Sequence, residues 1–181
     1  FIFTDICKRY IHRVDLSNLK FNTSYKYQLK MGYLYSDEFS FNTYLKNKTN
    51  HNIIIFGDMG AVNAVTIDYI YDKIKKNSYD YLIHLGDIGY NLRSYFGLIG
   101  DLYLSNFEHI SSSIPYMTIP GNHESYDNFS NYINRFTMPN YKIYNNLYYI
   151  LEHPPIKIIN FNTEVFYYES LSPTYDSQMN F

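Results

Sequence analysis

Apolar and polar residues alternate with a period of two in two stretches near the start of the chain. The apolar positions are Tyr25, Tyr27 and Leu29 in the first stretch, and Phe39 and Phe41 in the second. Such alternation is typical of strands that bury one face. We therefore predict that the chain is all-β up to residue 45.

A polar turn is expected between these two stretches, at Tyr33 to Asp37. The string from Leu19 to Tyr25 resembles a tyrosine corner, in which a phenol hydroxyl hydrogen-bonds the backbone just upstream. That feature points to a β-sandwich of the fibronectin type III kind. Only the last strands of such a sandwich fit into this length, so we expect it to be truncated at its amino end.

The pattern changes after a polar segment at residues 46–52, which we interpret as a linker. Short apolar runs then appear at Ile53–Phe56, Tyr81–Leu85 and Tyr116–Ile119, and each is rich in strand-forming residues. Between these runs, apolar residues recur at helical spacing. Strands that alternate with helices predict parallel pairing and an α/β layer fold.

Three helices and two further strands complete this second part. The first helix has Asn63 as a candidate cap and lysines near its carboxyl end, and the second contains Phe107 and Ile110. The last strands are expected at residues 147–151 and 156–161, on either side of Pro154 and Pro155. The apolar face of the first helix is Ile67, Ile70, Tyr71 and Ile74, its lysines are Lys73, Lys75 and Lys76, and the third helix is marked by Phe129, Ile133 and Phe136.

Composition narrows the class of protein. The chain has 181 residues, of which 46% are hydrophobic, so it can form a core. Its net charge of −2 argues against a nucleic-acid binder, because such proteins normally present a basic face. No apolar run approaches the roughly 18 residues of a membrane span. Cys7 is the single cysteine, which excludes an intrachain disulfide, and the chain begins at Phe1 without a signal-peptide pattern, as if inside a folded unit.

Each of the three apolar runs ends at a glycine followed by an oxygen-bearing side chain. These side chains are Asp58, Asp87 and Asn122. Parallel strands bring their carboxyl ends to one edge of a sheet, where open α/β folds bind ligands. Hard cations prefer oxygen ligands, and a carboxylate can bridge two of them in a pair that clamps a phosphoryl transfer. Three such strand ends in sequence therefore indicate a metal site.

The three motifs also resemble a known family. They read G-D-x-G at Gly57–Gly60, G-D-x-x-Y at Gly86–Tyr90 and G-N-H-E at Gly121–Glu124. In this order they resemble the calcineurin-like metallophosphoesterases and, within them, the purple acid phosphatases. The wider family has a histidine ligand in the first motif, which is missing here. In the purple acid phosphatases a tyrosine of the second motif replaces it, and this chain has Tyr90 at that position.

The resemblance implies a site and an activity. Asp58 and Tyr90 would bind Fe(III), Asp87 would bridge, and Asn122 would bind a divalent partner (zinc, iron or manganese). His123 would contact the phosphate of a small-molecule phosphate monoester, which a metal-bound hydroxide would hydrolyse at acid pH. It also implies a secreted, vacuolar or lysosomal location. Sequons that start at Asn22, Asn47 and Asn128 permit a glycoprotein. The oligomeric state, the substrate and the divalent metal stay open.

The resemblance further implies a domain division. Residues 1–45 would be the last part of the family's amino-terminal fibronectin-like domain, residues 46–52 the linker, and residues 53–181 the first part of the phosphoesterase domain. The family needs three further histidine ligands in downstream motifs, and His153 matches neither motif. We therefore expect the chain to be a fragment of an acid phosphatase that is inactive by itself.

Two other functions are weighed against this one. The first is a catalytically silent metallophosphoesterase-like module that binds or interacts. The second is a nucleotide-binding α/β domain, although the chain has no glycine-rich phosphate loop. Among the remaining histidines, His84 is expected to be a core residue, and His12, His51 and His109 are expected to lie on the surface.

Overall fold

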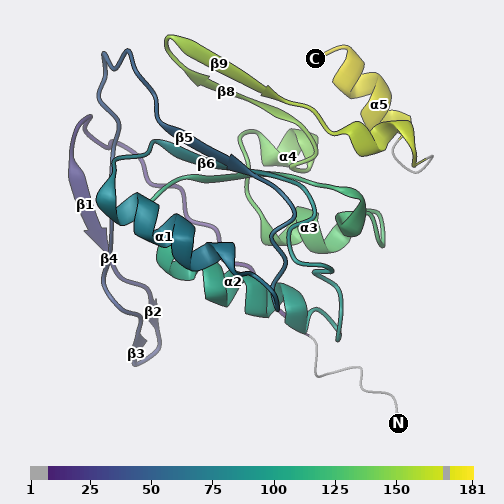
Figure 1. Cartoon of the computed structure of the whole chain (residues 1–181), viewed down its shortest axis with the longest axis horizontal. Coiled ribbons are helices and arrows are strands. Elements are labelled where there is room, and N and C mark those ends of the chain that lie inside the picture. The colour runs from purple at the N-terminus through teal and green to yellow at the C-terminus, as the bar shows by residue number, and fades with distance from the viewer. Residues whose placement is uncertain (1–7, 169–171) are drawn as a thin grey trace.

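A three-stranded parallel sheet forms the centre of the molecule (Figure 1). The computed structural model describes residues 8–168 and 172–181, so Cys7 lies outside the described residues. The sheet has the order β5 (Ile53–Phe56), β6 (Tyr81–Leu85) and β7 (Tyr116–Ile119), and all neighbours are parallel. The three strands have the predicted bounds, which confirms the α/β fold expected from the sequence.

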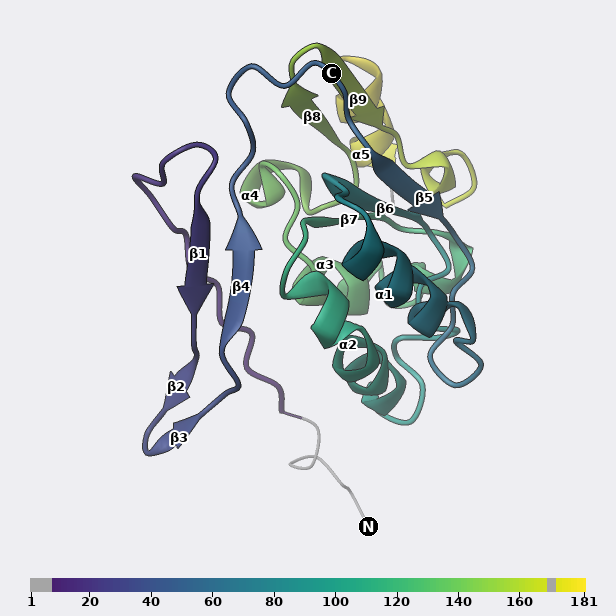
Figure 2. The ribbon, with the colours of Figure 1, turned by 60° about the vertical axis from the view of Figure 1, so that its left-hand side comes forward.

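Helices connect the parallel strands because each crossover must return the chain to the same end of the sheet. α1 (Thr66–Lys76) links β5 to β6, and α2 (Leu98–Ser111) links β6 to β7. The two helices lie side by side against one face of the sheet (Figures 1 and 2). Ile67 and Ile70 of α1 and Phe107 and Ile110 of α2 are buried, as the apolar spacing predicted.

The predicted cap of α1 is wrong. Val65 is the residue that precedes the helix, and no side chain there bonds the free N–H groups. Asn63 accepts a hydrogen bond from the Val65 N–H through its backbone carbonyl, at 2.8 Å. The lysines in the last turn do lie as predicted, where a positive charge favours the carboxyl end of a helix.

The third helix, α3 (Ser130–Arg135), is shorter than the apolar pattern suggested, because Phe129 and Phe136 flank it rather than lie within it. Both phenylalanines are buried all the same. Four short helical segments were not predicted: η1 (Asn122–Glu124), α4 (Tyr141–Tyr144), η2 (Thr163–Phe166) and α5 (Ser172–Met179).

The last two strands form an antiparallel hairpin of their own. β8 (Tyr149–His153) pairs with β9 (Ile156–Asn160), and Pro154 and Pro155 form the turn. The parallel pairing expected from strand–helix–strand repetition does not extend to these two strands, which no helix separates. A two-residue connection permits only an antiparallel pair, because a parallel one needs a crossover of a dozen or more residues.

The amino-terminal part forms two antiparallel ladders (Figure 2). β1 (Ser24–Tyr27) pairs with β4 (Phe39–Asn42), and β2 (Lys30–Met31) pairs with β3 (Leu34–Tyr35). The predicted turn at residues 33–37 is therefore wrong in part, because the chain turns at Gly32 and Tyr33 and two of those residues belong to β3. Gly32 has a φ of +60°, which a glycine adopts without strain.

The tyrosine corner is confirmed. The Lys20 N–H donates to the Tyr25 hydroxyl at 2.9 Å. The ring of Tyr25 stacks on Phe41, its partner across the ladder, with centroids 5.6 Å apart. These contacts confirm strands at Tyr25 and Phe41, whereas Leu29 is exposed outside β1 and residues 8–23 contain no strand, so the all-β prediction is wrong for those parts. The assignment to the end of a fibronectin-like sandwich and the domain boundary at residue 45 stay predictions.

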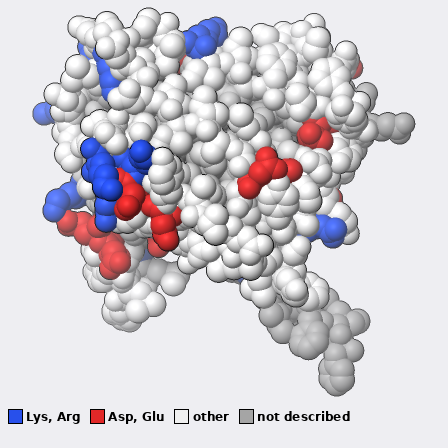
Figure 3. Space-filling view, in the orientation of Figure 1, with Lys and Arg blue, Asp and Glu red and all other residues white. Residues whose placement is uncertain are grey.

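The face of the molecule drawn in Figure 3 carries charges of both signs. Figure 3 shows basic and acidic side chains gathered together at one side of this face, with isolated charges elsewhere. No helix of the described segments is both long enough and apolar enough to cross a membrane.

Candidate metal centre

The carboxyl ends of the three parallel strands bring the sequence motifs to one edge of the sheet. Backbone hydrogen bonds hold the first two motif turns against each other. The Asp58 N–H donates to the Gly86 carbonyl at 3.3 Å, and the Gly60 N–H donates to the Ile88 carbonyl at 3.0 Å. The side chains that follow β5 and β6 are therefore neighbours, as parallel strand order requires.

Three of the predicted side chains converge at this edge. The Tyr90 hydroxyl donates to Oδ1 of Asp58 and lies 3.4 Å from Oδ2 of Asp87. The hydrogen bond to Asp58 raises the pKa of the Tyr90 phenol, and burial and the Asp87 charge act in the same direction. The phenol of Tyr90 thus lies between two carboxylates at a position open to solvent, since Asp58 and Tyr90 are exposed.

The backbone at these residues is strained. Asp58, Asp87 and Tyr90 have φ values of 55°, 52° and 45°, in the left-handed region that side chains with a Cβ seldom adopt. Such a conformation costs roughly 1–3 kcal/mol per residue and persists only where the surroundings enforce it. The surroundings of Asp87 provide that constraint.

Glu124 holds the second and third motifs together. Its carboxylate accepts the backbone N–H groups of Asp87 and Ile88, both at 2.9 Å, and that of Gly121 at 3.0 Å. The side chain is buried, which raises the pKa of Glu124, although the three N–H donors oppose the shift. The sequence analysis gave Glu124 no role, and the only signal for one was the last letter of G-N-H-E.

Gly121 is required for the close approach of the two motif turns. A Cβ at this position would lie 2.3 Å from Oδ1 of Asp87. Any other residue would therefore push the Asp87 carboxylate out of place.

His123 lies against the converging oxygens. Its backbone N–H donates to Oδ1 of Asp87 at 3.1 Å, and its ring packs on Tyr90 with centroids 4.5 Å apart. Its Nδ1 lies 2.6 Å from Oδ1 of Asn91, a residue that sequence reasoning missed. No motif letter pointed to Asn91, which simply follows Tyr90.

Asn122 is next to the site, but its amide forms no hydrogen bond with the described residues. Its neighbours fix its backbone, because Gly121 is bonded to Glu124 and His123 to Asp87. Within residues 8–168 and 172–181, no three His, Cys, Asp or Glu side chains are grouped so as to hold a metal ion. The potential ligands brought together are therefore the oxygens of Asp58, Asp87 and Tyr90, with Asn122 alongside.

The other histidines lie away from this edge. His84 is fully buried, its Nδ1 is 2.5 Å from the Tyr116 hydroxyl, and burial lowers its pKa to about 3, so the prediction of a core residue is confirmed. His12 and His109 are exposed as predicted. His51 is not, because its side chain is only 3% exposed and its ring lies 4.3 Å from that of His153.

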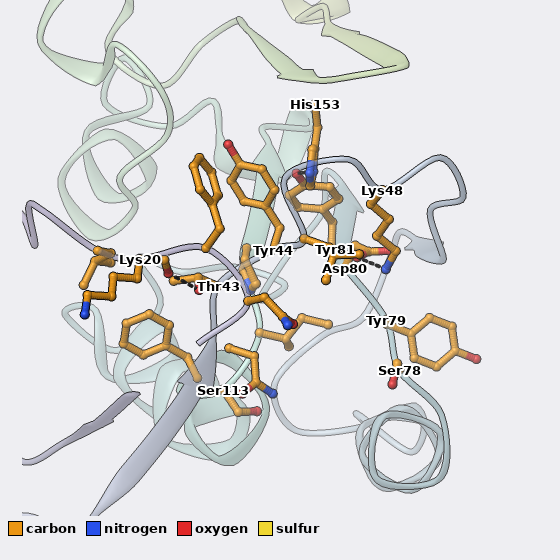
Figure 4. Close-up of a pocket in the computed structure, with 18 residues that line it drawn as sticks. Lys20, Thr43, Tyr44, Lys48, Ser78, Tyr79, Asp80, Tyr81, Ser113 and His153 are labelled. Atoms are coloured by element: carbon orange, nitrogen blue, oxygen red, sulfur yellow. Dashed lines mark hydrogen bonds and ion pairs between the residues drawn. The ribbon is translucent and has the colours of Figure 1, made fainter. Parts of the chain in front are cut away.

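A separate cavity lies at the opposite end of the sheet (Figure 4). It has a volume of about 820 Å³ and lies between the amino-terminal strands and the segments that lead into β6 and β7. Tyr44, Asp80, Tyr81 and His153 line it, and none of the predicted ligands does. This cavity is therefore distinct from the candidate metal centre.

Comparisons with known proteins agree with the motifs. A family model described as calcineurin-like phosphoesterase matches residues 51–177. The mouse (Mus musculus) protein named acid phosphatase type 7 is 37% identical over 163 residues, which cover 89% of this chain and 36% of that relative. The human (Homo sapiens) protein of the same name gives the same figures.

Two further matches come from plants. An Arabidopsis thaliana protein named "Probable inactive purple acid phosphatase 1" is 30% identical over 136 residues, which cover 64% of this chain and 22% of that relative. A solved structure of a purple acid phosphatase from yellow lupin (Lupinus luteus) seeds has a TM-score of 0.67 at 20% identity, covering 78% of this chain and 30% of that one. This last likeness shows the fold. The chain spans only 36% of the length of the mouse and human relatives.

Proposed function

Because the chain belongs to the calcineurin-like phosphoesterase family, we propose that the protein that contains it is an acid phosphatase of the purple acid phosphatase type. Its substrates would be small-molecule phosphate monoesters. The convergence of Asp58, Asp87 and Tyr90 at one edge of the sheet is the observation that carries this proposal.

The donor atoms fit hard cations. All three converging groups offer oxygen, and a cation could take the place of the proton that the Tyr90 hydroxyl directs at Asp58 and Asp87. Asp58 and Tyr90 would hold Fe(III), Asp87 would bridge, and Asn122 would hold the divalent zinc, iron or manganese. When bound, two such ions would act as Lewis acids on the phosphoryl group and make a water molecule nucleophilic below neutral pH.

The residues of the chain have separate tasks in this proposal. Glu124 fixes the turns, so that the Asp87 carboxylate is in place before any ligand arrives. His123 contacts a phosphate oxygen of the substrate from its position beside Tyr90. A contact of this kind orients the ester for attack and stabilises the charge that develops on phosphorus-bound oxygen.

The proposal extends to the setting of the protein. An activity at acid pH suits a secreted, vacuolar or lysosomal location. The sequon asparagines Asn22, Asn47 and Asn128 are all exposed, which suits glycosylation on such a route.

One alternative keeps specific support. A relative that is 30% identical has a name that marks it as inactive, which favours a silent module of the same fold. Both hypotheses expect the same described fold, and they differ only in turnover.

A phosphomonoesterase assay separates the two. The full-length protein is supplied with iron and zinc and assayed at acid pH. The acid phosphatase hypothesis requires turnover that a chelator abolishes. A correctly folded, metal-loaded protein without turnover would establish the silent module instead.

A further inference from the structure

Asn91 makes the one side-chain hydrogen bond that the His123 ring has with the described residues. The Asn91 Oδ1 lies 2.6 Å from the His123 Nδ1. A carbonyl oxygen only accepts, so Nδ1 must carry a proton and donate. The other ring nitrogen, Nε2, has no partner in the described part of the chain and is left for a ligand.

The segment that carries Asn91 is fixed in place. Its backbone carbonyl accepts the Ser94 N–H at 3.0 Å, and the carbonyl of the next residue, Leu92, accepts the Gly100 N–H at 3.1 Å. Leu92 itself is 1% exposed and belongs to the core. Asn91 therefore acts from a rigid support, which is what precise placement of a second side chain needs.

We propose that Asn91 is a positioning residue for His123, which directs Nε2 of the imidazole toward the phosphate of the substrate. This inference rests on the phosphatase function proposed above. The bond to the Asn91 carbonyl occupies Nδ1 of the ring. Nε2 is then the ring nitrogen left for the phosphate.

Three contacts define the place of the ring. The backbone N–H is bonded to Asp87, one ring face packs on Tyr90, and Nδ1 is bonded to Asn91. Removal of the third contact frees rotation about the side-chain bonds while the first two remain. We expect Nε2 to point away from the position it has in the parent, with little change in the fold.

The test uses two substitutions in the full-length protein. Asn91→Leu keeps the size and removes the acceptor, whereas Asn91→Asp keeps an acceptor oxygen. We expect kcat/KM for a phosphate monoester to fall roughly 10–100-fold in Asn91→Leu, which is typical when a supporting partner is removed. Asn91→Asp should stay within a few-fold of the parent, and metal content should be the same in all three proteins.

A spectroscopic measurement tests the same point without turnover. Long-range ¹H–¹⁵N correlation spectra of the metal-free protein show which nitrogen of a neutral imidazole carries the proton. The His123 signal is assigned by its loss in His123→Asn. We expect the Nδ1–H form in the parent and in Asn91→Asp, and a loss of that form in Asn91→Leu.

Asn134→Leu is the matched control. Asn134 is also an asparagine with a hydrogen-bonded amide, but it is exposed on α3 and bonds the Ser130 carbonyl. It should alter neither readout. An Nε2–H form in the parent, or an Asn91→Leu protein with parental spectra and kcat/KM, would overturn the inference. A parent without turnover would refute the proposed function, and the spectra would still decide the role of Asn91.

Discussion

At the carboxyl end of the parallel sheet the oxygens of Asp58 and Tyr90 lie together at the surface, whereas at the amino end the rings of His51 and His153 are buried against each other. Backbone hydrogen bonds from neighbouring turns hold the first group. Aromatic packing holds the second, in which Tyr44 lies 4.2 Å from the His153 ring.

The difference lies in what each region leaves unsatisfied. The carboxyl end gathers two carboxylates, and the neutral phenol of Tyr90 that lies between them leaves their charges in place, so this end attracts a cation. Among the described residues, two buried imidazole nitrogens at the amino end, Nδ1 of His51 and Nε2 of His153, have no hydrogen-bond partner. Burial lowers the pKa of His153, because a buried charge is costly. One end therefore suits ligand binding, and the other end joins parts of the chain.

The largest expected effect comes from the centre of the carboxyl-end site. Asp87→Asn keeps the size of the side chain and removes the charge that faces Tyr90 and the His123 N–H. Removal of a partner outside the ligand shell typically lowers metal affinity or activity roughly 10–100-fold. Loss of a bridging ligand should therefore lower kcat by at least roughly 100-fold. Steady-state hydrolysis of a phosphate monoester by the full-length protein measures it.

Asp68→Asn is the control for this substitution, because Asp68 is an exposed carboxylate in the first turn of α1. It should leave kcat unchanged. An Asp87→Asn protein with kcat within twofold of the parent would remove Asp87 from the site.

The next effect is on stability. Glu124→Ala leaves three backbone N–H groups without their acceptor in a buried place. Each unsatisfied buried group costs about 1–3 kcal/mol, and water can reach some of them in the space left behind. We expect a loss of about 3 kcal/mol in the free energy of unfolding, measured by urea denaturation.

The exposed pair of Glu152 and Lys157 gives a matched comparison for the Glu124 result. The two charges are 2.9 Å apart at the surface, so Glu152→Ala should cost less than about 1 kcal/mol. Equal losses for the two substitutions would mean that the Glu124 hydrogen bonds do not hold the turns.

The parts of the fold that sequence predicted are those with a strong local pattern. The strands β5, β6 and β7 have the predicted bounds, because each is a short run rich in strand-forming residues that ends at a glycine or proline. The prediction of the α1 cap failed because Asn63 is of a residue type that often caps helices but does not lie at the start of α1. α4 has four residues and no apolar periodicity, so the sequence pattern did not predict it.

The candidate site divides in the same way. Asp58 and Asp87 could be placed together from strand order, and Tyr90 was added by the resemblance of the second motif to the purple acid phosphatases. Asn91 and Glu124 could not be placed in the site from the sequence. Their roles depend on hydrogen bonds between the loop that follows β6 and the segment that follows β7. The burial of His51 was missed because its partner, His153, is about a hundred positions away in sequence and only the fold brings them together.

The third effect tests the phenol at the carboxyl end. Tyr90→Phe removes the hydroxyl that bonds Asp58 and leaves the ring on His123. A ferric phenolate absorbs visible light, so the iron-loaded full-length protein should lose its colour. Iron affinity should fall roughly 10–100-fold, which corresponds to about 1.4–2.7 kcal/mol.

Tyr95→Phe is the control for the colour, because Tyr95 lies on the same loop and is 74% exposed. Its visible spectrum should equal that of the parent. Colour that survives in Tyr90→Phe and disappears in another tyrosine variant would assign the phenolate elsewhere.

The smallest effect concerns the buried histidines at the amino end. Burial lowers the pKa of His153, the neighbouring His51 and Lys48 lower it further, and Asp80 opposes them. A histidine with a lowered folded pKa stabilises the fold fully above its unfolded pKa of about 6.5, and this stability is lost as pH falls toward the folded value. The titratable groups that face His153 also include the phenols of Tyr44 and Tyr81.

His153→Phe should therefore flatten the pH dependence. Phenylalanine keeps the aromatic packing on Tyr44 and His51 and cannot be protonated. Between pH 7.5 and 5 the parent should lose on the order of 1 kcal/mol more of its free energy of unfolding than the variant, since one pKa unit corresponds to about 1.4 kcal/mol.

Part of the slope should remain in the variant, because the pKa of His84 is lowered to about 3. The loss of the Tyr81 contact shifts the whole curve, so the slope of the unfolding free energy against pH is the quantity to compare. His109→Gln, at an exposed position, should leave that slope unchanged. Equal slopes for the parent and His153→Phe would mean that the amino-end histidines are as open to protons as surface residues, and the contrast between the two ends of the sheet would not hold.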